Sequence, residues 1–172
     1  NRGCKVLFNG GIKTIVEDVG MTRAPLIKTQ SIEETLLIKI WVQENIGIIE
    51  SAFNETTRYG KFKNITFNQT GNYLHLRISA STGEAMGMNM LTKGSENVVN
   101  LIKNKFNNIK VLSLSGNYCT DKKNSSLNWI LGRGKKVIAE SIIDEDIINK
   151  YLHTNMDDLI ELNINKNLIG SN

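Results

Sequence analysis

The chain has 172 residues, of which 40% are hydrophobic and 22% are charged, and its formal net charge is +4. These values are typical of a globular protein of one domain or two small ones, since a chain of this length can bury a substantial core. The positive charges are scattered, which argues against a nucleic-acid partner but permits a phosphate-bearing small ligand.

Cysteine and histidine are scarce, with only Cys4, Cys119, His75 and His153. They are too few and too widely spaced for a disulfide framework or a zinc site, so we predict no metal and a reducing environment. No apolar run reaches the roughly 18 residues of a membrane span. The chain does not begin with Met and ends inside an apparent helix, so we expect a piece of a longer protein.

The first strands are expected to be short. Alternating apolar residues predict a strand at 12–16, and a second short strand is expected at 26–28. Residues 20–25 are expected to connect them, because Pro25 forces the preceding residue away from helical backbone angles.

A helix should begin at Ser31, because Ser31 and Glu34 have the spacing of a capping box. It is expected to end near Asn45, and a second short helix is expected at 48–53. The apolar residues expected on the buried face of the first helix are Leu36, Leu37, Ile40 and Trp41.

Residues 62–67 and 73–80 are predicted to form a hairpin. The second strand places apolar side chains at every other position, with His75 and Arg77 on the opposite face. A helix is expected at about 95–106, burying Val98, Val99, Ile102 and Phe106, and a strand is expected at 110–114.

From residue 26 the predicted order is therefore β-α-β-β-α-β, the ferredoxin-like pattern of an α+β domain. We place this domain at residues 25–113, inserted into a larger and here incomplete α/β domain. The larger domain would comprise residues 1–24 and, after a connecting loop, residues within 114–172. In that last part, a strand is expected at 137–143 and helices at 144–152 and 155–166.

The sequence Ser-Gly-Asn-Tyr-Cys-Thr-Asp-Lys-Lys at 115–123 follows the predicted strand at 110–114. The carboxylate of Asp121 and the ammonium groups of Lys122 and Lys123 could together hold an anionic substrate and polarise a carbonyl. Taken alone, such a triplet is more often a solvated charged turn.

The stretch Gly-Glu-Ala-Met-Gly-Met-Asn-Met at 83–90 lies between a predicted strand and a predicted helix. Its glycines permit close backbone approach, and free amides at a helix N-terminus attract phosphate. Its methionines could lie against a flat ring or simply fill gaps in the core. Arg58 could pair with a phosphate, although a surface arginine is the more frequent outcome.

Several motifs occur in a fixed order along the whole chain. They are Asn-Arg-Gly-Cys at 1–4, Gly-Met-Thr-Arg-Ala-Pro at 20–25, Met-Gly-Met-Asn-Met at 86–90, the 115–123 stretch, Gly-Arg-Gly-Lys at 132–135 and Asn-Ile-Asn-Lys-Asn-Leu at 163–168. In this combination the chain resembles part of the catalytic region of the 3-hydroxy-3-methylglutaryl-coenzyme A (HMG-CoA) reductases. The methionine-rich motif resembles the eukaryotic, NADPH-using class I.

The resemblance implies an NADPH-dependent oxidoreductase that reduces HMG-CoA by four electrons to mevalonate and coenzyme A. It implies that the ferredoxin-like domain binds NADPH, that the larger domain binds the substrate and that Lys122 is catalytic. The implied substrate-binding residues are Arg2, Arg23, Ser115, Asn117, Asp121, Lys123 and Lys166, with Arg2 facing the coenzyme A phosphates. The implied cofactor-binding residues are Thr57, Arg58, Glu84, Met86, Gly87, Met88 and Asn89, with Arg58 meeting the 2′-phosphate of NADPH.

The resemblance also implies a cis peptide bond between Cys119 and Thr120. It places a catalytic Glu before Asn1, and a catalytic Asp and His after Asn172, so we predict that the 172 residues alone are inactive. The chain departs from the family at Thr57, Glu84, His153 and residues 124–126. These departures keep open the alternative of a non-catalytic nucleotide-binding module. An RNA-binding ferredoxin-like domain is disfavoured, because the central strands lack the expected aromatic pair.

The resemblance implies a homo-oligomer with active sites formed between subunits. For the parent protein it implies the endoplasmic reticulum membrane, reached through an N-terminal anchor that this chain does not contain. The catalytic region would then face the cytosol.

Overall fold

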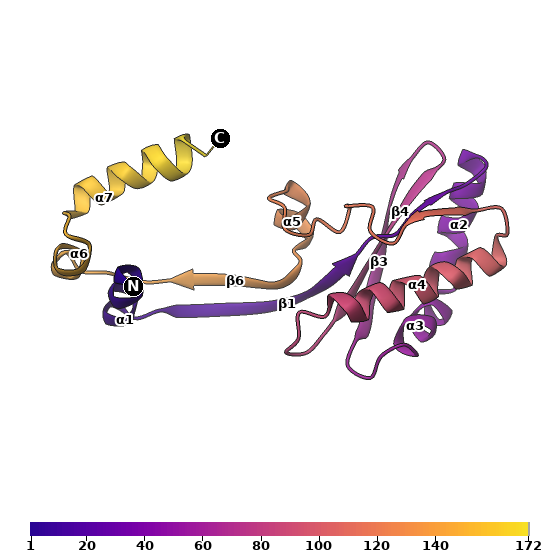
Figure 1. Ribbon diagram of the computed structural model, residues 1–172, viewed down its shortest axis with the longest axis horizontal. Coiled ribbons are helices and arrows are strands. Elements are labelled where there is room, and N and C mark those ends of the chain that lie inside the picture. The colour runs from indigo at the N-terminus through magenta and orange to yellow at the C-terminus, as the bar shows by residue number, and fades with distance from the viewer. Residues whose placement is uncertain (172) are drawn as a thin grey trace. The chain divides into compact units, whose positions relative to one another are not determined.

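The computed structural model describes residues 1–171, which form two compact units (Figure 1). One unit comprises residues 17–136, and the other comprises residues 1–16 and the chain from 137 onward. Each unit is described by itself. Within the described residues, no helix combines the length and apolar character that crossing a membrane requires.

The larger unit is built on an antiparallel sheet. Strand β4 (Tyr73–Ser81) is central, and β3 (Lys61–Thr70) pairs with one of its edges. Strand β2 (Leu26–Lys28) pairs with the other edge and also with β5 (Lys110–Ser113). The elements from β2 to β5 follow the predicted β-α-β-β-α-β order, with two consecutive helices in the first helical position.

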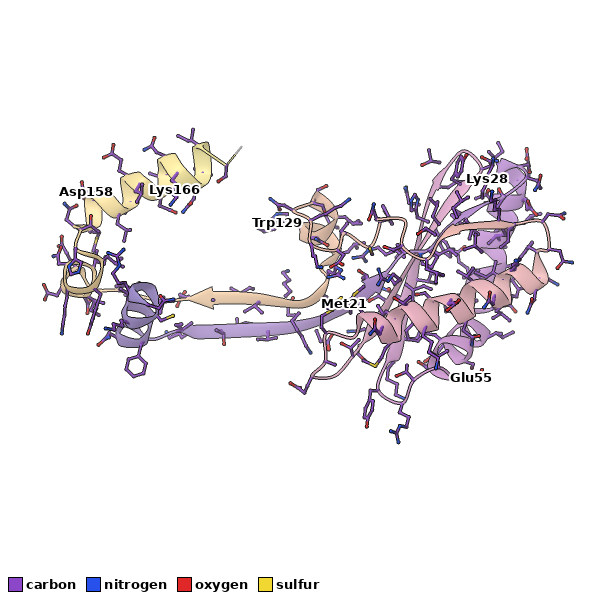
Figure 2. The ribbon with its side chains drawn as sticks, viewed as in Figure 1. Met21, Lys28, Glu55, Trp129, Asp158 and Lys166 are labelled. Atoms are coloured by element: carbon purple, nitrogen blue, oxygen red, sulfur yellow. The ribbon has the colours of Figure 1, made fainter. Side chains whose placement is uncertain are left out.

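Strand β1 (Lys13–Arg23) shares an edge of β4 with β2, so the expected connection at 20–25 is wrong for most of its length. Met21 pairs with Ala80, and the pairing continues through Arg23. Pro25 has no N–H to donate, yet its carbonyl accepts a hydrogen bond from the Leu76 N–H at 2.9 Å. The interruption is therefore confined to Ala24 and Pro25. Figure 2 labels Met21 and Lys28 towards opposite ends of this edge.

The core lies between one face of the sheet and three helices, α2 (Ile32–Glu44), α3 (Ile46–Asn54) and α4 (Met88–Lys105). The predicted alternation of β4 is confirmed, because the four side chains of its apolar face are fully buried in this core. They are Leu74, Leu76, Ile78 and Ala80. Figure 1 shows α4 running along this sheet beside α3.

The buried face predicted for α2 is wrong for three of its four residues, because only Trp41 packs against the core, whereas Leu36 and Ile40 are exposed like Leu37. Ile38 and Val42 are fully buried, whereas Leu37 is 57% exposed. The helix is apolar on nearly every side, so its hydrophobic pattern does not select one face. Its predicted start is confirmed, because Ser31 Oγ accepts the Glu34 N–H at 3.2 Å.

Helix α4 begins at Met88, several residues before the predicted start near Ser95. Gly87 precedes it in the left-handed conformation, with φ +78°, and no side chain caps the helix. The start is therefore set by backbone conformation instead of by a Ser, Thr, Asp or Asn cap. The methionine-rich stretch consequently supplies the first turn of α4.

Gly94 lies where α4 crosses the ring of Phe53 on α3. A Cβ added to Gly94 would lie 2.8 Å from Phe53 Cζ and closer still to Cε2 and Cδ2. We expect Gly94→Ala to lower the free energy of unfolding by about 1–2 kcal/mol, because overpacking outweighs the better helix propensity of alanine. Urea unfolding measures this change, and Gly47→Ala, where an added Cβ meets nothing within 4 Å, is the matched control.

The smaller unit contains α1 (Arg2–Gly10) and α6 (Glu145–Leu152), which pack through the buried side chains of Val6 and Ile148. Strand β6 (Gly134–Glu140) is a neighbour of β1 in the sheet and begins earlier than predicted. The final predicted helix is divided into α7 (Met156–Leu162) and a π-helix, η1 (Asn163–Ile169).

Candidate functional site

Residues 114–133 lie on the polar face of β4, opposite the helices. The Arg77 guanidinium donates to the Gly132 carbonyl at 2.9 Å, and the His75 and Tyr118 rings lie 5.5 Å apart between centroids. Burial of Arg77 lowers its pKa, because its charge is partly removed from water. The predicted polar face of β4 is thus the surface that supports this segment.

The start of the same segment is fixed to the edge formed by β1 and β2. The Gly116 N–H donates to the Ala24 carbonyl at 2.7 Å, and Thr22 Oγ1 donates to the Cys119 carbonyl at 2.9 Å. A Cβ at Gly116 would lie only 2.8 Å from Leu26 Cβ, so the close approach requires glycine. These contacts fix the position of the backbone at the start of the turn that follows Gly116.

The turn at 117–122 uses left-handed backbone angles at Asn117, Thr120 and Lys122, with φ of 63°, 57° and 55°. The expected cis peptide between Cys119 and Thr120 is wrong, because the described residues contain no cis peptide bond. The left-handed residues reverse the chain instead. Each non-glycine residue in this region costs roughly 1–3 kcal/mol, so surrounding contacts must hold the turn.

Arg133 connects this turn to the first turn of α4. Its Nη2 lies 3.1 Å from Asp121 Oδ1 and 3.0 Å from Met88 Sδ, and only 14% of its side chain is exposed. A charge-assisted contact of this kind is stronger when it is shielded from water. In the sequence Arg133 stands out only as part of the Gly-Arg-Gly-Lys motif at 132–135, because its two partners are distant along the chain.

A basic cleft of about 370 Å³ opens beside the turn. Among the described residues, five cationic side chains and no acidic side chain line it, and three of the five, Arg133, Lys135 and Lys136, are each paired with a nearby carboxylate. Such a surplus of positive charge favours an anionic ligand. The lining residues are Thr120, Lys122, Lys123, Asn128, Gly132, Arg133, Lys135 and Lys136.

A second cleft, of about 420 Å³, lies at the end of β4 near Met21 (Figure 2). Residues 82–86 form one wall, including the predicted cofactor residues Glu84 and Met86, and Met86 is 61% exposed. Lys135 lines both clefts and makes a 2.9 Å ion pair with Asp18. The two clefts are therefore adjacent within the larger unit.

The hydrogen bond from Lys135 and the nearby charge of Lys63 lower the pKa of Asp18, outweighing the opposing effect of burial. The contribution of this carboxylate to stability is complete above its unfolded pKa of about 3.9, and it is lost as the pH falls through the lower folded value. We expect the difference in unfolding free energy between the wild type and Asp18→Asn to shrink below about pH 4. Denaturant titrations at several pH values test this.

Glu96→Gln, which alters an exposed carboxylate with no ion pair among the described residues, is the control for Asp18→Asn. Its difference from the wild type should lack the same pH dependence. An ordinary carboxylate is half protonated at about pH 4. A difference in unfolding free energy between the wild type and Asp18→Asn that stays constant from neutral pH to about pH 3 would therefore contradict the expectation.

Thr57 and Arg58 lie at the same end of the β3–β4 hairpin as the second cleft, because Lys61 at the start of β3 pairs with Ser81. Thr57 Oγ1 accepts the Gly60 N–H at 3.1 Å, so this hydroxyl shapes the local turn. Arg58 is exposed, with its guanidinium 5.5 Å from the centre of the Tyr59 ring. The structure thus gathers the predicted cofactor segments at one end of the sheet.

The predicted substrate residues fall into two groups. The first group lies in the larger unit. Its members in the stretch 115–123, which contains the turn, are Ser115, Asn117, Asp121 and Lys123. Arg23 completes the group and donates from Nε to Thr92 Oγ1 on α4 at 3.0 Å. Arg2 and Lys166 belong to the smaller unit, where both are exposed, and Figure 2 labels Lys166 on η1. The assignment of these two residues to the substrate site stays a prediction.

The described residues contain no group of three or more His, Cys, Asp or Glu side chains able to hold a metal ion. The fold and the site together define a mixed α/β protein with an antiparallel sheet and adjacent clefts, one of them strongly basic. Residues 1–172 match the family model described as hydroxymethylglutaryl-coenzyme A reductase. The chain belongs to the hydroxymethylglutaryl-coenzyme A reductase family.

The chain is 45% identical over 174 residues to a 3-hydroxy-3-methylglutaryl-coenzyme A reductase of Strongylocentrotus purpuratus. It is 47% identical over 174 residues to 3-hydroxy-3-methylglutaryl-coenzyme A reductase 2 of Dictyostelium discoideum. Both matches cover 99% of this chain but only 19% and 33% of the respective relatives. The chain therefore spans between a fifth and a third of these relatives.

The fold is similar to that of a class II 3-hydroxy-3-methylglutaryl-CoA reductase from Streptococcus pneumoniae, whose structure was solved with NADPH bound in open conformations. The TM-score is 0.63 at 18% identity, over 87% of this chain and 38% of that one. At this identity the likeness supports the fold alone.

Proposed function

We propose that the complete protein carrying this segment reduces HMG-CoA to mevalonate and coenzyme A, with NADPH as the reductant. The observation that carries the proposal is that Arg133 contacts both Asp121 and Met88, and so joins the Lys122 turn to the first turn of α4. This contact brings a cationic cleft beside the stretch proposed to hold the cofactor. Membership of the family supports the same assignment.

Lys122 is the proposed catalytic residue. Each two-electron reduction of the substrate carbonyl develops negative charge on its oxygen, and a fixed ammonium group stabilises that charge. Lys122 is exposed towards the basic cleft, and no described residue is recorded as its ion-pair or hydrogen-bond partner. Its ammonium group is thus available to a substrate oxygen.

The second cleft, together with the start of α4 that follows its 82–86 wall, supports the binding of a nicotinamide nucleotide. Gly87 leaves the first amides of α4 uncapped by any side chain, and such amides attract phosphate. Met86 supplies an exposed apolar surface for a ring. The residues proposed to hold NADPH are Thr57, Arg58, Glu84, Met86, Gly87, Met88 and Asn89. When bound, NADPH supplies hydride.

The polar residues of the turn are proposed to bind the hydroxymethylglutaryl group, with Arg23 and Lys166 directed at its carboxylate. Arg2 is proposed to contact the coenzyme A phosphates. A carboxylate and phosphates are ligands that a cationic surface favours. The turn residues in this proposal are Ser115, Asn117, Asp121 and Lys123.

The order β5-β2-β4-β3 and the antiparallel pairings support a ferredoxin-like arrangement for the cofactor-binding part. We propose residues 25–113 as this domain, inserted into the larger substrate-binding domain represented by 1–24 and part of 114–172. The complete protein is proposed to be a homo-oligomer with active sites between subunits. It is proposed to be anchored in the endoplasmic reticulum membrane by a segment N-terminal to this chain.

The test is turnover by the purified complete protein. We expect loss of NADPH absorbance that depends on HMG-CoA, with mevalonate as the product. The 172 residues alone are expected to be inactive, because the family's catalytic Glu, Asp and His are proposed to lie outside them. Nucleotide binding by the complete protein without any reduction would favour the non-catalytic module instead.

A further inference from the structure

Asn128 lies in the first turn of α5 (Ser126–Leu131), directly after the Lys122 turn. Its backbone N–H donates to Ser125 Oγ at 3.3 Å and to the Ser125 carbonyl at 3.1 Å. Ser125 therefore caps the helix and fixes the point from which the Asn128 side chain reaches back. The segment between Lys123 and Ser125 is too short to move independently of this cap.

The side-chain amide of Asn128 makes hydrogen bonds to both ends of the turn. Its Nδ2 donates to the Thr120 carbonyl at 3.2 Å and to the Lys123 carbonyl at 2.9 Å. Its Oδ1 accepts a short hydrogen bond from Thr120 Oγ1. Both amide N–H groups and the amide oxygen of Asn128 thus form hydrogen bonds with residues 120–123.

Only Asp121 and Lys122 lie between the two carbonyls that Asn128 binds. The carboxylate of Asp121 is held by Arg133, while Lys122 has a left-handed backbone and an exposed side chain in the basic cleft. The backbone of the turn is therefore fixed on both sides of Lys122. The direction in which the Lys122 side chain leaves the backbone depends on that constraint.

We propose that Asn128 is a positioning residue that holds Lys122 in the orientation needed for reduction. This inference rests on the proposed function of Lys122. Asn128 acts through the backbone carbonyls of Thr120 and Lys123 and does not itself act on the substrate. Its amide N–H donors are essential to this role, because two carbonyl oxygens must be satisfied together.

The experiment uses the complete protein with Asn128→Ala and Asn128→Asp. We expect kcat to fall by about 10- to 100-fold in Asn128→Ala, since small misplacements of a catalytic group have effects of this size. KM for NADPH should stay within about twofold, because the cofactor segments are untouched. Asn128→Asp should be at least as impaired, because a carboxylate repels the two carbonyls.

Asn72→Ala is the matched control. Asn72 also donates from Nδ2 to a backbone carbonyl, that of Thr29 at 2.9 Å, but it lies in the turn between β3 and β4. Its loss should affect stability without lowering kcat. Equal falls in kcat for Asn72→Ala and Asn128→Ala would show a general structural effect and overturn the proposal.

The decisive comparison repeats Asn128→Ala in a Lys122→Ala background. If Asn128 acts through Lys122, the second substitution should change the residual kcat by less than about twofold. A full 10- to 100-fold loss in both backgrounds would overturn the proposal. Near-normal kcat in Asn128→Asp would also overturn it, because that variant keeps the size of the side chain and loses the amide donors.

Two further measurements keep the inference testable. If Asn128→Ala does not fold, Thr120→Val removes one of the three hydrogen bonds with little change in shape, and an unchanged kcat in that variant would overturn the proposal. If the wild type reduces no HMG-CoA, the proposed function fails. Amide hydrogen exchange at residues 121–123 then tests separately whether Asn128 fixes the backbone of the turn. Faster exchange is expected in Asn128→Ala but not in Asn72→Ala.

Discussion

Replacing Lys122 by alanine is expected to lower kcat of the complete protein by about 100- to 1,000-fold, the range found when one stabilising donor is removed from a developing oxyanion. The loss follows from the position of Lys122 in a basic cleft, with its backbone fixed in a turn. Because the side chain is exposed, the free energy of unfolding should change by less than about 0.5 kcal/mol. Steady-state kinetics and urea unfolding measure the two quantities.

Lys103→Ala is the matched control for Lys122→Ala, since Lys103 is an exposed lysine in the last turn of α4 and lines neither cleft. It should leave kcat unchanged. A Lys122→Ala protein that is folded and retains near-normal kcat would show that another group stabilises the substrate oxygen.

Replacing Phe53 by alanine is expected to lower the free energy of unfolding by about 3–5 kcal/mol, the usual cost of truncating a fully buried aromatic ring. Phe53 has no exposed surface, lies 6.0 Å from the Phe62 ring between centroids and fills the space left by Gly94. Few neighbours can move into the cavity, because α3 and α4 are both packed on the sheet. Urea unfolding should show a lower midpoint with a similar slope.

Tyr59→Ala removes an aromatic ring that is 70% exposed, so its effect on unfolding should remain within about 0.5 kcal/mol. In the Phe53→Ala background, Gly94→Ala should no longer destabilise, because the ring that it would strike is absent. A destabilisation by Phe53→Ala below about 1 kcal/mol would contradict the expectation that the Phe53 ring is tightly packed in the core.

Strand β4 could be predicted from the sequence because its two faces differ strictly in polarity. Leu74 and Leu76 alternate with His75 and Arg77, and a period of two specifies which side faces the core. The same reasoning failed for α2, whose apolar side chains surround the helix and leave the buried side to tertiary packing. Hydrophobic periodicity therefore predicts the buried face of an element only where polar and apolar residues lie on different faces.

The start of α4 could not be predicted because Gly87 acts through its backbone conformation, which leaves no capping side chain in the sequence. The extent of β1 was missed for a related reason. Gly20 has φ +89° within the strand, although a glycine with a positive φ is more usual in a turn. In both places the fold uses a glycine conformation that sequence patterns do not distinguish.

The residues of the Lys122 turn could be identified from a contiguous motif, but its supports could not. Arg133 contacts Asp121 and Met88, which lie 12 and 45 residues away along the chain. A contact between such distant positions depends on the folded sheet, so one sequence alone does not encode it in a readable pattern. The residues of this turn are therefore the part of the candidate site that the sequence describes best, and the contacts that support the turn are the part it describes least.

The larger unit begins at Glu17 and ends at Lys136, and these two residues form an ion pair at 3.8 Å. Its entrance and exit are therefore within reach of one another, on the neighbouring strands β1 and β6. A segment with adjoining ends can be gained or lost in evolution as a single event, because a short splice bridges the gap it leaves. Because its two ends lie close together, the unit formed by residues 17–136 is also suited to exchange between members of the family, with little rearrangement at the junctions.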